Sequence, residues 1–253
     1  MMMTSLEVLF TPAEFDLLPK RDLSQTVCVV FDVLRATSSM MTALAGGAAE
    51  IIPVAGIPEA LAVRQQHPGA LLAGERDGVR IRAELSGGVD FDLGNSPREF
   101  TPEVVRGRTL VVSTTNGTRA LRACARARRV LIGSFLNLRT VAGWIQREKP
   151  ADLMVVCSGT YAQTAYEDVL AAGGLCDLVW EAFAAGEVSD SARMARQIWQ
   201  AGRADLMDAM RHSRNGRRLL AHPELHDDVR VCLQNDSLSF IAELCSDGVV
   251  RRV

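Results

Sequence analysis

The sequence lacks the features of several common protein classes. No apolar run approaches the ~20 residues that a membrane-spanning helix needs, so we expect no membrane association. The formal net charge is −2, whereas general nucleic-acid-binding proteins normally carry a basic excess, so we expect no nucleic-acid partner. Neither a Walker-type glycine loop nor a G-x-G-x-x-G motif follows any expected strand, which leaves nucleotide binding without a motif.

Paired cysteines are missing as well. The six cysteines are scattered, none forms a C-x-x-C pair, and most lie inside apolar runs, where a free thiol behaves as a small hydrophobe. No secretory signal pattern is recognisable. Since these observations together favour a reducing compartment, we expect a soluble cytoplasmic protein.

What is present is an alternation of strand and helix patterns. Hydrophobic residues make up 48% of the chain, and β-branched runs alternate with segments of helical periodicity, which predicts an α/β protein with a three-layer α/β/α arrangement and a largely parallel or mixed sheet. The expected strands are 6–10, 27–31, 50–54, 70–73, 109–113, 130–132 and 153–157. The expected helices include 40–45, 58–63, 120–124, 138–145 and 167–183.

We expect one α/β domain over residues 1–253 and leave open whether it consists of two pseudo-repeated lobes. The C-terminal part is expected to be helical from about residue 165, with a terminal strand pair within 240–253. Residues 77–95 are rich in glycine and charge and lack periodicity, which is typical of a long functional loop or a small ribbon.

The segment 27–47 places polar side chains between a strand and a helix. Asp32 ends the apolar run, and Arg35 and Thr37 follow in the turn before the helix. Helix N-termini favour bound oxyanions, although Asp32 and Thr37 are equally suited to capping the helix. The spacing Asp32-x-x-Arg35-x-Thr37 recurs in 113–118 as Ser-x-x-Asn-x-Thr, which suggests a duplicated strand-turn-helix unit.

Similar polar groups follow the other expected strands. Each has a local alternative: Ser96 is suited to an N-cap, Asn116-Gly117 to a turn, and Glu167-Asp168 to the first turn of a helix. As a set, carboxylates, hydroxyls and arginines at strand ends are what a Mg²⁺-assisted phosphoryl site requires.

Six ordered motifs carry a family resemblance, namely FDVLRATSSMMTALAGGA, GERDG, FDLGNSPREF, STTNGTRAL, IGSFLNL and YEDVLAAGG. In this order they resemble the 2-phosphosulfolactate phosphatase family (ComB-like proteins). The resemblance is dense over 27–174 and looser in the tail, through 213–216 and 247–248. It implies a Mg²⁺-dependent acid phosphatase that converts 2-phospho-3-sulfolactate to 3-sulfolactate and phosphate, a step toward coenzyme M.

Two departures from the family pattern concern the substrate. Asp90 precedes Phe91 where members usually carry glycine, and the loop 76–90 is longer and more charged than expected. If that loop contacts the sulfonate-bearing part of the substrate, the identity of the substrate changes while phosphatase chemistry does not.

The motifs and the charge pattern together assign roles to the strand-end residues. We expect a small anionic phosphorylated substrate and bound Mg²⁺, with Asp32 as nucleophile or as a further metal ligand. The catalytic candidates are Asp32 and Arg35. The substrate-binding candidates are Thr37, Arg76, Asn95, Ser96, Thr115, Asn116, Gly117, Thr118 and Ser134. The metal-binding candidates are Glu75, Glu167 and Asp168.

Other functions are open at this point. A non-catalytic binding module for an anionic metabolite would use the same anion-binding turns at the strand ends. A phosphatase of another phospho-acid would use the same chemistry. A lyase or transferase is less favoured because the sequence shows no histidine or lysine in a setting distinctive of a catalytic base. His222 and His226 are spaced as a metal clip, but the neighbouring Asp228 suggests a solvated face, and Pro223 suggests a helix start. Tyr161 is expected in a core or an interface, and we expect a homo-oligomer.

Overall fold

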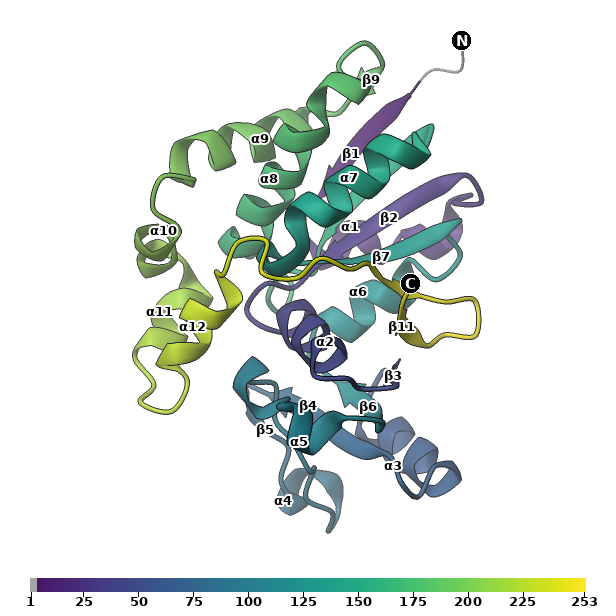
Figure 1. Ribbon diagram of the computed structural model, residues 1–253, viewed down its shortest axis with the longest axis vertical. Helices are drawn as coiled ribbons and strands as arrows, with labels where there is room; N and C mark the ends of the chain where they lie inside the picture. Colours follow the sequence, from purple (N-terminus) through teal and green to yellow (C-terminus); the bar gives the residue numbers. More distant parts are fainter. Residues whose placement is uncertain (1–3) are drawn as a thin grey trace.

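The β-branched runs of the sequence form the strands of one mixed sheet in the computed structural model, which describes residues 4–253 (Figure 1). The sheet has eleven strands in the order β5-β4-β6-β3-β11-β10-β7-β2-β8-β1-β9. Their bounds are β1 Ser5–Leu9, β2 Thr26–Phe31, β3 Glu50–Pro53, β4 Leu71–Arg76, β5 Val79–Arg80, β6 Thr109–Ser113, β7 Arg129–Gly133, β8 Asp152–Cys157, β9 Glu187–Val188, β10 Ala242–Leu244 and β11 Val250–Arg252.

Two parallel blocks make up most of this sheet. The strands β7, β2, β8, β1 and β9 form one block, and β4, β6 and β3 form the other. The C-terminal hairpin β10–β11 lies between them, and each of its outer contacts is a single antiparallel residue pair, Glu243 with Leu131 and Val250 with Ile51. The terminal strand pair expected from the sequence is therefore confirmed, and it joins the two blocks.

Helices cover both faces of the sheet, as the alternation of residues in β2 shows. Val27 and Val29 pack into one hydrophobic core with α7 (Leu138–Glu148) and α8 (Tyr166–Phe183). Cys28 and Val30 pack into a second core with α2 (Ala36–Ala45) and α6 (Gly117–Ala123). Because successive strand residues face opposite sides, the predicted three-layer α/β/α arrangement is confirmed.

The remaining helices are short or lie toward the C-terminus. They are α1 Pro12–Phe15, η1 Leu18–Lys20, α3 Ile57–Gln66, α4 Ala83–Ser86, η2 Pro97–Glu99, α5 Pro102–Val105, η3 Phe135–Asn137, α9 Asp190–Gly202, α10 Leu206–His212, α11 Arg214–Leu220 and α12 His226–Cys232. Within residues 4–253, no helix combines the length and the apolar character needed to cross a bilayer.

Some element boundaries differ from the sequence-based expectation. The strand expected at 70–73 continues to Arg76 because β5 pairs with its end, Glu75 opposite Arg80. The segment 77–95 thus contains a small ribbon and the short helix α4. The helix expected to start at Pro223 begins at His226 instead.

Candidate functional site

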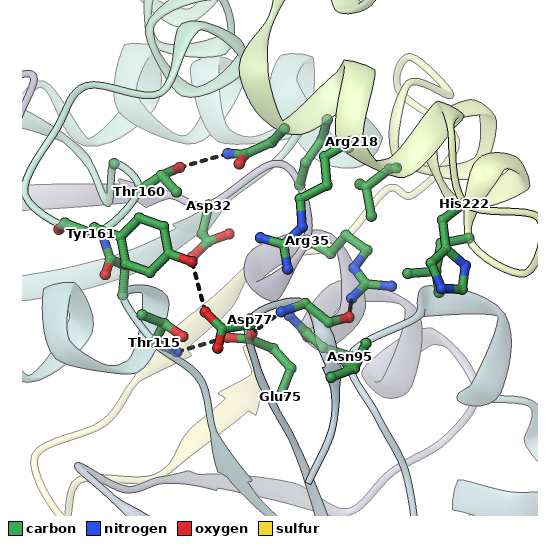
Figure 2. Close-up of a pocket in the computed structure, with 18 residues that line it drawn as sticks. Asp32, Arg35, Glu75, Asp77, Asn95, Thr115, Thr160, Tyr161, Arg218 and His222 are labelled. Atoms are coloured by element: carbon green, nitrogen blue, oxygen red, sulfur yellow. Dashed lines mark hydrogen bonds between the residues drawn. The ribbon is translucent and has the colours of Figure 1, made fainter.

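A pocket lies where β2, β4, β6 and β8 end and where the C-terminal helices α11 and α12 approach the sheet (Figure 2). The strand ends meet although they belong to different blocks: the Asn116 side chain after β6 donates to the Ser158 carbonyl after β8 at 2.9 Å. Most of the residues that line it are polar. Those from the strand ends are Asp32, Arg35, Glu75, Asp77, Thr115 and Asn116; Asn95 comes from the segment before η2; and those from later segments are Thr160, Tyr161, Asn215, Arg218 and His222.

The turn after β2 holds Asp32 at the N-terminus of α2. Asp32 Oδ1 accepts a hydrogen bond from the Ala36 backbone N–H at 3.0 Å. Thr37 Oγ1 donates to the Asp32 carbonyl and accepts from the Asp32 N–H, both at 3.0 Å. The fully buried Thr37 hydroxyl therefore bonds to the backbone of Asp32. The Asp32 side chain accepts from the first N–H of α2, as the capping alternative expected, and also lines the pocket.

Burial raises the pKa values of three acids in and behind the pocket, and like charges add to the effect at two of them. Burial raises the pKa of Asp32 to about 6, and the nearby carboxylates Glu75 and Glu167 push it in the same direction. Burial also raises the pKa of Asp168, to which Asp32 and Glu167 contribute. The pKa of Glu167 is raised by its burial. These groups therefore sense one another electrostatically and favour a bound cation or a shared proton.

Two of the acids fasten loops together through backbone amides. Glu75 accepts from the Thr115 N–H at 2.8 Å and from the Gly78 N–H at 2.7 Å, which ties the loop after β6 to the β4–β5 turn. Asp168 accepts from the Val33 N–H at 2.8 Å and from the Gly159 N–H at 3.1 Å. Asp168 thus fixes the segments that follow β2 and β8.

Glu167 has an unpaired oxygen. Its Oε1 accepts from Asn215 Nδ2 at 2.5 Å, while its Oε2 is buried and has no partner among the described residues. A buried carboxylate oxygen without a partner is costly, and a hard cation would satisfy it. Oxygen ligands of this kind fit Mg²⁺, which prefers one or two carboxylates and retains waters.

The expected metal-binding trio does not converge. Within residues 4–253, no three acidic, histidine or cysteine side chains gather closely enough to form a metal cluster. Glu75, Glu167 and Asp168 are therefore not assembled as three ligands of one ion. Both oxygens of Glu75 and both of Asp168 already accept hydrogen bonds, which leaves Glu167 and Asp32 as the better-placed pair.

Arg35 is held by a buried ion pair. Its Nη1 lies 2.6 Å from Asp228 Oδ2, and its Nη2 donates to the Gly78 carbonyl at 2.6 Å. Asp228 Oδ1 accepts from Ser96 Oγ at 2.7 Å. The expectation of a solvated face at Asp228 is wrong: this carboxylate is fully buried because α12 packs against η2 and brings it to the arginine.

Several pocket residues come from α11 and from the loop after β8, and sequence reasoning missed them. Arg218 points into the pocket (Figure 2) and forms no ion pair within the described part of the chain. Gly78 makes room for it, since a Cβ there would lie 2.9 Å from Arg218 Nη2. Tyr161 is 51% exposed at the pocket rather than in a core, and its hydroxyl donates to Asp77 Oδ1 at 2.7 Å. The sequence feature that could have pointed to the α11 residues was the Ser-Arg-Asn-Gly segment 213–216, which resembles the family pattern.

Other predicted substrate-binding residues lie behind the pocket wall. Thr118 and Ser134 are fully buried and bond locally, Thr118 to the Thr114 carbonyl and Ser134 to Asn137. Arg76 donates to the Ser113 hydroxyl and carbonyl at the end of β6. None of these three side chains lines the pocket.

Gly117, by contrast, is required where it is. A Cβ at this position would lie 2.6 Å from both Asp32 Oδ2 and the Ala36 Cβ. Its lack of a side chain lets α6 approach the turn after β2, so that the strand ends of the two blocks meet.

Comparison with known proteins identifies the family. The family model described as 2-phosphosulpholactate phosphatase matches residues 13–247. The chain belongs to the 2-phosphosulfolactate phosphatase family. Proteins named probable 2-phosphosulfolactate phosphatase include that of Caldanaerobacter subterraneus, 36% identical with 91% of this chain and 92% of that protein covered. Those of Pseudothermotoga lettingae (35%; 93% and 96% covered) and Clostridium acetobutylicum (33%; 88% and 91% covered) are similar to it as well. The resemblance stated from the motifs is confirmed.

Replacing Asp228 with asparagine should destabilise the protein by about 3 kcal/mol, because Arg35 would be left buried without its counter-charge. The matched control is Asp227→Asn, since its side chain is 55% exposed and lies next in sequence; this change should cost less than ~0.5 kcal/mol. Urea unfolding of both variants measures the difference. Equal stabilities would show that the buried pair does not hold α12 in place.

Gly117→Ala should lower both stability, by about 1–3 kcal/mol, and any activity that depends on Asp32, because the new methyl group collides with that carboxylate. Gly143→Ala in α7 is the control, where a Cβ meets nothing closer than 3.7 Å; it should be neutral or stabilising by up to ~1 kcal/mol. Thermal melts and turnover report the two effects. A Gly117→Ala variant as active and as stable as the parent contradicts the close approach.

Proposed function

We propose that this family member is a phosphatase of small phosphorylated acids. We propose that its substrate is 2-phospho-3-sulfolactate, which it hydrolyses to 3-sulfolactate and phosphate. The observation that carries the proposal is that the Asp32 carboxylate, whose pKa is raised, shares one pocket with the guanidinium of Arg218, which forms no ion pair within the described residues. A simple anion receptor would gain nothing from carboxylates in its pocket. The relatives carry the name of this activity.

We further propose that Mg²⁺ is the cofactor and that Asp32 and Glu167 hold it. The unpaired Oε2 of Glu167 and the mutual repulsion of these acids support this assignment. When bound, the ion supplies positive charge that neutralises the phosphoryl oxygens and the carboxylates.

Asp32 is assigned as the nucleophile. Its carboxylate oxygen attacks phosphorus, the bond between phosphorus and the ester oxygen breaks, and that oxygen takes a proton from water and leaves as the hydroxyl of 3-sulfolactate. Water then hydrolyses the aspartyl phosphate and regenerates the carboxylate. The Arg218 guanidinium faces the pocket and is suited to binding non-bridging oxygens, whereas Arg35 is occupied by Asp228 and the Gly78 carbonyl.

Phosphate release from a panel of phospho-acids tests the proposed reaction. With Mg²⁺ present, 2-phospho-3-sulfolactate should give the highest kcat/KM, and EDTA should abolish turnover. In the absence of substrate, Mg²⁺ should raise the melting temperature of the parent but not of Glu167→Gln, because the ion binds the folded state only. No release from any panel member would favour the non-catalytic binding module.

Asp32→Asn should lower kcat by ~10³-fold or more, since the amide is not a nucleophile. The same variant should be more stable than the parent in EDTA. The pKa of Asp32 is about 6 when folded, above the unfolded value of about 3.9, so ionisation costs stability progressively as the pH rises between these values. The stability gain should thus be small at pH 4 and reach about 1–3 kcal/mol at pH 7.

Denaturant titrations at the two pH values measure that gain. Normal turnover by Asp32→Asn would show that Asp32 takes no part in the reaction. A stability difference that does not depend on pH shows instead that the carboxylate is not under repulsion.

A further inference from the structure

A second cavity adjoins the pocket and shares part of its wall. Arg35, Gly78, Asn95 and His222 are among the residues that line both spaces. The second cavity has a volume of about 460 Å³, against about 110 Å³ for the pocket. A ligand seated in the pocket therefore has room to extend past Asn95 into the larger space.

The two spaces differ in charge. The pocket is lined by three carboxylates, Asp32, Glu75 and Asp77, and by two guanidinium groups, those of Arg35 and Arg218. The second cavity, here called the arginine cavity, is lined by Arg80, Arg82 and Arg98 in addition to Arg35, with Glu99 and Glu224 as its acids. One end of the combined space thus suits a cation-bound phosphoryl group, and the other suits an anion.

The acids of the arginine cavity do not cancel its arginines. Glu99 accepts hydrogen bonds from the backbone N–H groups of Gly94 and Ser96, at 2.8 and 3.4 Å, and so faces the backbone. Glu224 forms no ion pair within residues 4–253, where Arg98 donates only to its backbone carbonyl, at 3.2 Å.

The arginines differ in how far they are committed. Arg98 lies 3.6 Å from Asp228 and 3.8 Å from Asp227, so it is partly neutralised. Arg80 uses its Nε to donate to the Phe91 carbonyl at 2.5 Å, which fixes the side chain and leaves its terminal nitrogens available. Arg82 forms neither an ion pair nor a side-chain hydrogen bond in the described part of the chain. Arg80 and Arg82 are therefore the principal donors for a ligand.

The β4–β5 ribbon sets the distance between the two ends. Glu75 and Arg80 are directly opposite in the antiparallel ladder, where paired Cα atoms lie about 4.5–5.5 Å apart. One residue of this pair lines the pocket and the other lines the arginine cavity. A ligand of a few carbons is long enough to span both.

We propose that the arginine cavity binds the sulfonate at the non-reacting end of the substrate while the phosphoryl group lies in the pocket. Arg80 and Arg82 are specificity-determining residues in this arrangement. The assignment rests on the proposed phosphatase function and adds to it the residues that select a substrate with a second strong anion. It also gives the charged loop 77–95 a role in substrate selection.

The test compares two esters that differ in one anion, 2-phospho-3-sulfolactate and 2-phospholactate. Arg82→Gln should raise the KM for the sulfonated ester about tenfold, as expected for loss of one charge-assisted contact, with kcat and the constants for 2-phospholactate changed less than twofold. Arg82→Lys should restore part of the affinity because it keeps the charge. Arg147→Gln, a change on the exposed end of α7, is the matched control and should alter neither KM.

Equal effects of Arg82→Gln on both esters, or no effect on either, would overturn the proposal. Binding of 3-sulfolactate measured by calorimetry separates this failure from failure of the proposed function, because it needs no turnover. If the parent protein hydrolyses neither ester but Arg82→Gln weakens 3-sulfolactate binding at least fivefold relative to Arg147→Gln, the anion site stands and the phosphatase assignment fails. Unchanged 3-sulfolactate binding overturns the anion site itself.

Discussion

Repulsion among buried carboxylates is the constraint on which this structure depends. Asp32 follows β2, whereas Glu167 and Asp168 are neighbours in the first turn of α8. The charge of Glu167 raises the pKa of Asp32, and the charges of Asp32 and Glu167 raise the pKa of Asp168. A fold that only needed stability would separate them. Here backbone N–H groups hold Asp168 and Asp32 in place. The repulsion that remains among the carboxylates would be relieved by a bound cation or by nearby cationic side chains. Function and folding therefore oppose each other at this point.

Two arginines near these acids, Arg35 and Arg218, play different parts. Arg35 is fixed by Asp228, so its role is to join α2, the β4–β5 turn and α12 into one wall. Arg218 has no such partner in the described residues and faces the open pocket. The C-terminal helices thus complete a site whose acids come from the sheet, and the hairpin β10–β11 joins the two blocks that supply them.

Local sequence patterns predicted the sheet and the position of Asp32 well. A β-branched run followed by an acid and a helical period describes β2, the turn and α2 almost completely, because each signal is local. The same logic selected Thr37, Thr118 and Ser134, whose hydroxyls bond within their own turns instead. A short polar side chain after a strand satisfies either its own backbone or a ligand, and sequence alone does not separate these outcomes.

By itself the sequence determined the layered α/β fold, the family and the acidic character of the strand ends, since periodicity, turn chemistry and ordered motifs are local properties of the chain. Only the tertiary structure decided which polar groups share a pocket. Asp228 meets Arg35 across 193 positions of sequence, and Arg218 reaches the pocket because Gly78 leaves it space. Such contacts depend on how elements distant in sequence pack together. The local sequence pattern of one segment does not indicate which other segment it will contact.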